Sequence, residues 1–172
     1  MDSETLRALQ APLKQRYRDE PAAAVVTLRA SGALEEGIAC KVDTGRTTVE
    51  AGLHPASGGS GLQACSGDML LEALVACAGV TLGAVATALG VEVRGGTVRA
   101  EGDLDFRGTL GVDKETRVGF HRIRLGFELD TDATEEQLDR LLTLTERYCV
   151  VLQTLRTPPE FTLSRARSAR PS

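Results

Sequence analysis

An uncharged run from Ala73 to Val91 constrains the fold of this chain more than any other feature. It reads ALVACAGVTLGAVATALGV, which approaches the length needed to cross a bilayer, and Gly79 and Gly83 have the GxxxG spacing of associating membrane helices. Against a membrane span stand the many weakly apolar Ala, Gly and Thr residues and the absence of a Lys/Arg cluster at either flank. The pattern favours a helix buried between a sheet and other helices, with Gly79 and Gly83 allowing a second backbone to approach.

Length and composition predict one domain. The chain has 172 residues, of which 42% are hydrophobic and 26% charged. We expect a helical extension over 1–20, a single domain over 21–165 and a flexible tail over 166–172. A net charge of −4 without a long basic run argues against nucleic acid as a partner. The N-terminus lacks the apolar core of a secretory signal, so a cytoplasmic protein is expected.

Periodicity predicts the order α-βββ-α-ββ-α-β, which is an α+β fold with sheets against long helices. The first helix has Ser3 as its predicted N-cap, and Pro12 is expected to kink or divide it. The apolar helix is expected to begin near Gly67, after Ser66 as N-cap, and to end at Gly90. The remaining predicted elements are three antiparallel strands over 22–32, 37–45 and 46–54, two strands over 91–108 and 117–131, a helix over 130–155 capped by Asp132 or Thr134, and a last strand over 159–165.

Two cysteines lie on apolar faces of the two long predicted helices. Cys77 is inside the uncharged run, and Cys149 shares one face of the later helix with its leucines. Two core-facing helices in a small domain should touch, so the two thiols can meet. Alternatively, both cysteines could be small buried hydrophobic residues without a chemical role. A thiol becomes nucleophilic when a cation or helix N-terminus lowers its pKa, and Cys77 is in mid-helix, so activation would require a neighbouring Arg.

Other candidate residues give weaker signals. Cys65 is either an alternative resolving thiol or a packed loop residue, and Cys40 alternates with apolar residues, which indicates core packing. His54 could join cysteines in a mixed metal site, but the sequence has no close-spaced ligand pair such as CxxC. We therefore expect neither a metal nor another cofactor. Arg147 lies two residues before Cys149, off the face of that thiol on a continuous helix.

Two motifs resemble those of the OsmC/Ohr family. The stretch GDMLLEALVACAGVTLGAVATALGVEV, 67–93, is similar to the central helix of that family, which carries a carboxylate, a Leu-rich turn and Ala-Leu-x-Ala-Cys before small residues. The stretch ERYCVVLQTL, 146–155, resembles its second cysteine motif. The predicted strand order also fits, so the resemblance covers most of the chain from about Ala22 onward.

The resemblance implies an intertwined homodimer, in which two long central helices are wrapped by sheets from both chains and the active sites lie at the interface. It implies a peroxidase in which Cys77 attacks an organic hydroperoxide and becomes a sulfenic acid, which Cys149 captures as a disulfide. A dithiol of the lipoyl type would restore the pair by thiol exchange. A non-catalytic binding protein for a small ligand and a redox sensor are the alternative functions on the same scaffold.

The chain departs from the family pattern at the groups that surround the thiols. The family carboxylate corresponds to Asp68, and Glu72 stands where a small residue is usual; either could orient an Arg. The turn that carries the activating Arg in the peroxidases reads ASGALEEG here, which leaves Arg29 and Arg46 as nearby substitutes. Val150 follows Cys149 where Pro is usual, which predicts a helix that runs through Cys149 and weaker stabilisation of its thiolate.

Overall fold

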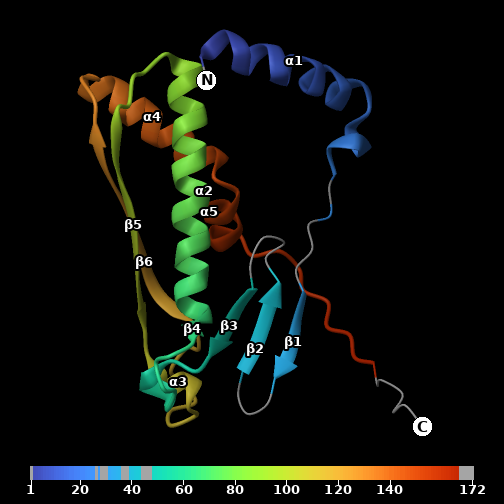
Figure 1. Cartoon of the computed structure of the whole chain (residues 1–172), viewed down its shortest axis with the longest axis vertical. Coiled ribbons are helices and arrows are strands. Elements are labelled where there is room, and N and C mark those ends of the chain that lie inside the picture. Colours follow the sequence, from blue (N-terminus) through green and yellow to red (C-terminus); the bar gives the residue numbers. More distant parts are fainter. Residues whose placement is uncertain (1, 26, 28–30, 36–38, 44–47, 167–172) are drawn as a thin grey trace.

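The computed structural model describes residues 2–25, 27, 31–35, 39–43 and 48–166. Helices and strands alternate in a mixed α+β fold, as predicted (Figure 1). In chain order the elements are α1 (Ser3–Asp19), η1 (Pro21–Ala24), β1 (Ser31–Glu35), β2 (Ala39–Asp43), β3 (Thr48–Gly52), η2 (Pro55–Ser57), β4 (Ala64–Cys65), α2 (Ser66–Leu89), β5 (Gly95–Leu104), α3 (Phe106–Thr109), β6 (Phe120–Asp130), α4 (Glu135–Tyr148) and α5 (Val150–Arg156).

The apolar run forms α2, the central helix of the molecule (Figure 1). Cys65 takes the N-cap position predicted for Ser66, so the helix begins one residue earlier than expected. It ends, as predicted, where Gly90 adopts a left-handed conformation with φ of 69°, which glycine reaches without a Cβ clash. By length and composition alone, α2 is the one helix among the described residues that could cross a membrane. It is instead a core helix of the fold, because it packs against β5, α4 and α5.

The core forms along one stripe of α2. Its buried residues recur every four positions and are Leu74, Ala78, Leu82 and Ala86. The N-terminal half of this stripe, Leu74 and Ala78, contacts α5 and the inner faces of β5 and β6. The C-terminal half, Leu82 and Ala86, contacts α4 around Leu141. The prediction of a helix between a sheet and other helices is therefore confirmed for this side of α2.

Strands β5 and β6 form an antiparallel pair that covers α2 on one side (Figure 1). Apolar side chains such as Val98 and its partner Phe127 face the helices. The opposite face is charged and exposed, and cross-strand ion pairs such as Arg99 to Glu128, at 2.6 Å, run along it. Exposed pairs of this kind contribute little stability individually.

The N-terminal sheet confirms three antiparallel strands and adds a fourth. Its order is β1-β2-β3-β4, and the short β4, which was not predicted, pairs in parallel with β3. The first strand differs from the predicted range, because Pro21–Ala24 forms a 3-10 turn and the described strand β1 covers Ser31–Glu35. The predicted turns at Gly37 and Gly45 lie outside the described residues.

Helix α1 corrects the predicted N-cap, and Pro12 does not divide the helix. Asp2, not Ser3, is the N-cap, and its carboxylate accepts a hydrogen bond from the Thr5 N–H at 2.7 Å. The helix continues through Pro12 and is not divided there. Proline removes one backbone donor, and on a helix as exposed as α1 water can satisfy the carbonyl that loses its partner.

The last predicted strand is absent from the described part of the chain. Residues 157–166, which include the alternating stretch PEFTLSR, contain neither helix nor strand. Phe161 and Leu163 are 81% and 95% exposed, respectively. Alternation makes a segment suitable for pairing, but a strand also needs a partner, and residues 157–166 pair with no other described strand.

Candidate functional site

The second long helix is interrupted at Cys149. The prediction of a helix running through this residue is wrong: α4 ends at Tyr148, Cys149 has φ of −72° and ψ of 105°, and α5 begins at Val150. The break disturbs few hydrogen bonds, because the Cys149 N–H still donates to the Thr145 carbonyl and the Cys149 carbonyl accepts from the Gln153 N–H. Cys149 therefore serves as C-cap of α4 and N-cap of α5.

This break brings backbone donors to the thiols. The first three N–H groups of a helix lack an intrahelical acceptor, and in α5 they belong to Val150, Val151 and Leu152. These N–H groups lower the pKa values of the thiols: Val150 and Val151 act on Cys77, and Val151 and Leu152 act on Cys149. The N-terminus of α5 thus supplies partial positive charge, whereas the sequence had led us to expect an Arg in this role.

Cys77 and Cys149 meet in the core, as the predicted contact between the two helices requires. Cys149 is completely buried with Leu74 and Ala78 of α2, and Cys77 packs against the same cluster but is only partly buried. Each thiol influences the pKa of the other, and both are free. The more accessible sulfur is therefore that of Cys77.

The pKa of Cys77 is lowered. Burial alone would raise it, but the neighbouring hydrogen-bond donors outweigh burial and favour the thiolate. In order of effect, the donors are the Val151 N–H, the Cys149 thiol, the Thr81 hydroxyl and the Val150 N–H. A thiol that is partly accessible and has a depressed pKa has the properties of a nucleophile.

The pKa of Cys149 is raised. Burial is the main cause, and the hydrogen bond with Cys77 and the negative charge of that thiolate raise it further, against the lowering effect of the Leu152 N–H. Cys77 is therefore the first of the two thiols to ionise, and Cys149 is the one that keeps its proton longer. The two groups titrate as a coupled pair.

A cavity of about 310 Å³ lies beside Cys149, between α4, α5 and the inner face of β6. Its lining is largely aliphatic and aromatic, and includes Leu125, Phe127 and Leu142. Arg156 and Glu146 also line it and form an ion pair with each other. This volume is at the lower end of the range of small-ligand sites.

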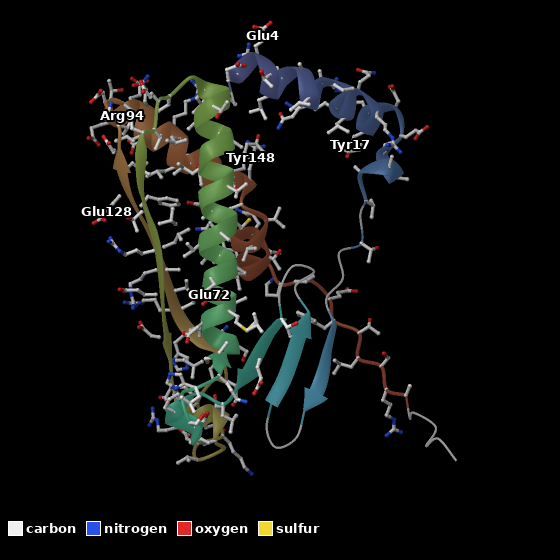
Figure 2. The ribbon with its side chains drawn as sticks, viewed as in Figure 1. Glu4, Tyr17, Glu72, Arg94, Glu128 and Tyr148 are labelled. Carbon is white, nitrogen blue, oxygen red and sulfur yellow. The ribbon has the colours of Figure 1, made fainter. Side chains whose placement is uncertain are left out.

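The predicted carboxylates do not join the thiol pair. Asp68 and Glu72 are both exposed on the first turns of α2, and neither forms a hydrogen bond or ion pair with another described residue. Figure 2 shows Glu72 near the N-terminal end of α2, well away from Tyr148, the neighbour of Cys149. The substitutes for the activating Arg, Arg29 and Arg46, lie outside the described residues.

The remaining sequence candidates occupy other places. Cys65 is at the N-cap of α2, twelve residues before Cys77, which corresponds to about 18 Å along a helix and is too far for a bridge within one chain. His54 stacks on Phe106 with ring centroids 5.0 Å apart, and its Nδ1 accepts a hydrogen bond from the Ala56 N–H. The side chain of Cys40, in β2, lies outside the described part of the structure.

Arg147 does not face the thiols. Its guanidinium lies over the ring of Tyr148, 5.5 Å from the centroid, in agreement with the prediction that it points away from Cys149. Sequence reasoning missed two contributors to the site, the N-terminus of α5 and the Thr81 hydroxyl. The spacing of four residues between Cys77 and Thr81 was the available signal for the second.

Comparison with known proteins establishes the family. The model of the OsmC family, described as OsmC-like protein, matches residues 59–164, and the chain belongs to this family. No curated protein sequence matches the chain.

Solved structures share the fold at low sequence identity. The OsmC-like protein of Mycoplasma pneumoniae has a TM-score of 0.65 at 16% identity, over 77% of this chain and 89% of its own. An organic hydroperoxide resistance protein of Elizabethkingia anophelis has a TM-score of 0.62 at 18% identity, over 78% and 91%. The organic hydroperoxide resistance protein OsmC of Legionella pneumophila has a TM-score of 0.61 at 15% identity, over 78% and 92%.

The lowering of the Cys77 pKa by the neighbouring Cys149 thiol gives a first testable expectation. In Cys149→Ala the Cys77 sulfur loses a donor, so its pKa should rise and its alkylation by iodoacetamide should require a higher pH. Cys149→Ser keeps a donor and should leave the profile close to that of the wild type. Mass spectrometry of the Cys77 peptide across a pH series measures this. A profile of Cys149→Ala that is unchanged or shifted to lower pH would contradict the assignment.

Proposed function

We propose that this protein is a thiol-dependent peroxidase that reduces organic hydroperoxides. The observation that carries the proposal is a pair of cysteines in one core cluster whose pKa values are shifted in opposite directions, with the lowered pKa on the more exposed residue, Cys77. Membership of the OsmC family supports it, and so do two structural relatives named as organic hydroperoxide resistance proteins.

The proposed reaction has three steps. The Cys77 thiolate attacks the terminal oxygen of the hydroperoxide, the O–O bond breaks, and Cys77 becomes a sulfenic acid while the alkoxide leaves and takes a proton as an alcohol. The Cys149 thiol then attacks the sulfenic sulfur, which forms a disulfide and releases water. A small dithiol of the lipoyl type reduces the disulfide by exchange and becomes a disulfide itself.

The arrangement also orders the first two steps. As long as Cys77 carries a negative charge, that charge helps to keep Cys149 protonated and unreactive. Oxidation of Cys77 removes the charge, so the pKa of Cys149 should fall only after the sulfenic acid has formed. Cys149 then becomes nucleophilic when its target exists.

The proposal includes a cytoplasmic homodimer. One side of α2 is apolar but exposed in the single chain: Val80 is 76% exposed, and the small residues Ala73, Ala76 and Ala84 on the same side are also exposed. A surface of this kind on a long central helix suits a second copy of the same helix. Burial of both stripes would complete the core that one chain leaves open.

The cavity beside Cys149 favours a second candidate function. A non-catalytic protein that binds a small apolar ligand would use this space of about 310 Å³ and keep both cysteines reduced. The two functions differ in their response to peroxide.

Thiol titration under peroxide distinguishes them. Fully reduced protein is mixed with tert-butyl hydroperoxide, and free thiols and disulfide-linked peptides are measured by mass spectrometry. The peroxidase should lose two thiols and yield a peptide pair that links Cys77 to Cys149. If both cysteines stay reduced in excess hydroperoxide, the peroxidase is rejected and the binding function remains.

A further inference from the structure

We propose that a second cavity, between α2, α5 and the first half of β6, binds an amphipathic anion. Arg117 and Arg122 hold the oxyanion head of this ligand, and its aliphatic chain lies on the apolar walls of the cavity. The inference goes beyond the proposed function, because binding of such a ligand requires neither a peroxide nor a reactive thiol.

The cavity has the size and the walls of a small-ligand site. Its volume is about 450 Å³, within the range of such sites. Leu74, which is completely buried, lines it, and so do Ile123, Leu152 and Leu155, which pack against the same core cluster. An aliphatic chain placed here would remove apolar surface from water, which stabilises the bound state in proportion to the area covered.

Positive charge gathers at the exposed side of this cavity. Arg117, Arg122 and Arg156 line it, and all three side chains belong to exposed residues. Within the described part of the chain, no Asp or Glu lines it. Arg156 already forms an ion pair with Glu146, so the charge without a counter-ion is that of Arg117 and Arg122.

Arg117 and Arg122 differ from the other arginines of the same region. The other arginines between positions 94 and 130 each form an ion pair with a carboxylate, namely Arg94, Arg99, Arg107 and Arg124. Arg117 and Arg122 form no ion pair with a described residue. Asp103, the cross-strand neighbour of Arg122, has both oxygens bonded to Arg124, at 2.5 and 2.8 Å. The two arginines without a carboxylate are thus the two that line the cavity.

The backbone at both arginines is held in place before a ligand binds. The Nε2 of His121 donates a hydrogen bond to the Arg117 carbonyl oxygen at 3.1 Å. The same oxygen lies so close to Gly108 that a Cβ at that position would be 2.9 Å from it. Arg122 belongs to β6, where it is paired with Asp103 of β5. Anchors that are already ordered reduce the entropy lost on binding.

The chemistry of the two side chains identifies the head group. A guanidinium presents a planar fork of donors that matches two oxygens of a carboxylate or a phosphate. Two such groups beside apolar walls favour an oxyanion on an aliphatic chain over a neutral chain or a bare anion. The chain would lie near the thiol pair, because Leu125 and Leu152 also line the cavity beside Cys149.

The test is isothermal titration calorimetry of the reduced full-length protein at low ionic strength. The probes are octanoate, octyl phosphate, 1-octanol and acetate, and the first two should bind at least tenfold more tightly than the last two. Their relative affinities show whether the head is a carboxylate or a phosphate. Arg117→Gln and Arg122→Gln should each weaken binding of the tighter probe roughly tenfold, the effect of one lost hydrogen bond between charged groups.

Arg147→Gln is the matched control. It also removes one positive charge, but the guanidinium of Arg147 lies over the ring of Tyr148 and does not line this cavity, so the affinity should not change. Urea unfolding of each variant confirms that it is folded, and Arg117→Lys and Arg122→Lys, which keep the charge and lose the fork, should bind with intermediate affinity.

Three results would overturn the inference: no binding of octanoate or octyl phosphate to the wild type, equally tight binding of 1-octanol, or unchanged affinity in both glutamine variants. The outcome is independent of the peroxidase assay. A protein that binds octanoate but does not reduce tert-butyl hydroperoxide would reject the proposed function and leave this site standing.

Discussion

Cys77→Ser is expected to reduce the consumption of organic hydroperoxide to the background of the assay. Serine has nearly the shape of cysteine, but its hydroxyl is not ionised at neutral pH, whereas the surroundings of Cys77 favour the thiolate. No sulfenic acid can form at position 77, so Cys149 has no partner to capture. The measurement is peroxide consumption in the presence of a lipoyl-type dithiol, together with the number of free thiols.

Two further substitutions complete this experiment. In Cys149→Ser the first step should survive, so a sulfenic acid should accumulate at Cys77 and be trapped by dimedone, while turnover with the dithiol stops. Cys65→Ser should behave like the wild type, because Cys65 is at the far N-terminal end of α2. Unchanged turnover in Cys77→Ser would show that another residue performs the attack.

Leu74→Ala is expected to lower the free energy of unfolding by about 2–5 kcal/mol. Leu74 is completely buried in the cluster that contains Ala78 and Cys149, so truncation removes its packing and leaves a cavity beside the thiol pair. Urea unfolding at a fixed protein concentration measures the change, since a dimer would make the midpoint depend on concentration.

The control for this substitution is Leu62→Ala. Leu62 is 91% exposed in the loop before α2, so the same truncation should change the free energy of unfolding by less than about 0.5 kcal/mol. Equal effects at the two positions would show that the cluster around Leu74 does not form the core. Leu74→Ala should also alter the pH profile of Cys77 alkylation, because Cys77 packs against this cluster.

Short sequence motifs correctly predicted the helix ends that depend only on neighbouring residues. Gly90 ended α2 because a left-handed residue there closes the last turn, and Thr134 capped α4 through a capping box with Gln137. The meeting of Cys77 and Cys149 also followed from periodicity, because two apolar helix faces in one small domain pack against each other.

The features that sequence reasoning missed depend on contacts between distant segments. The residues around Val150 give no signal of a helix break, because valine is compatible both with a continuous helix and with the first turn of a new one. The buried position of Cys149 against α2 accompanies the break, and the N–H groups of Val150 and Val151, just after it, lower the pKa of Cys77. The predicted last strand over 159–165 likewise needs a partner strand that local periodicity does not provide.

The charged outer face of β5 and β6 has a consequence for how the hairpin can assemble. Opposite each other stand Arg99 and Gly126, Glu101 and Arg124, and Val98 and Phe127, so charged and apolar side chains alternate on both strands. A slip of one residue would turn Phe127 toward water and push Glu128 against the helices without a counter-charge. The alternation therefore excludes a slip by one residue, and the apolar side chains of both strands stay on the face that packs against α2 and α5.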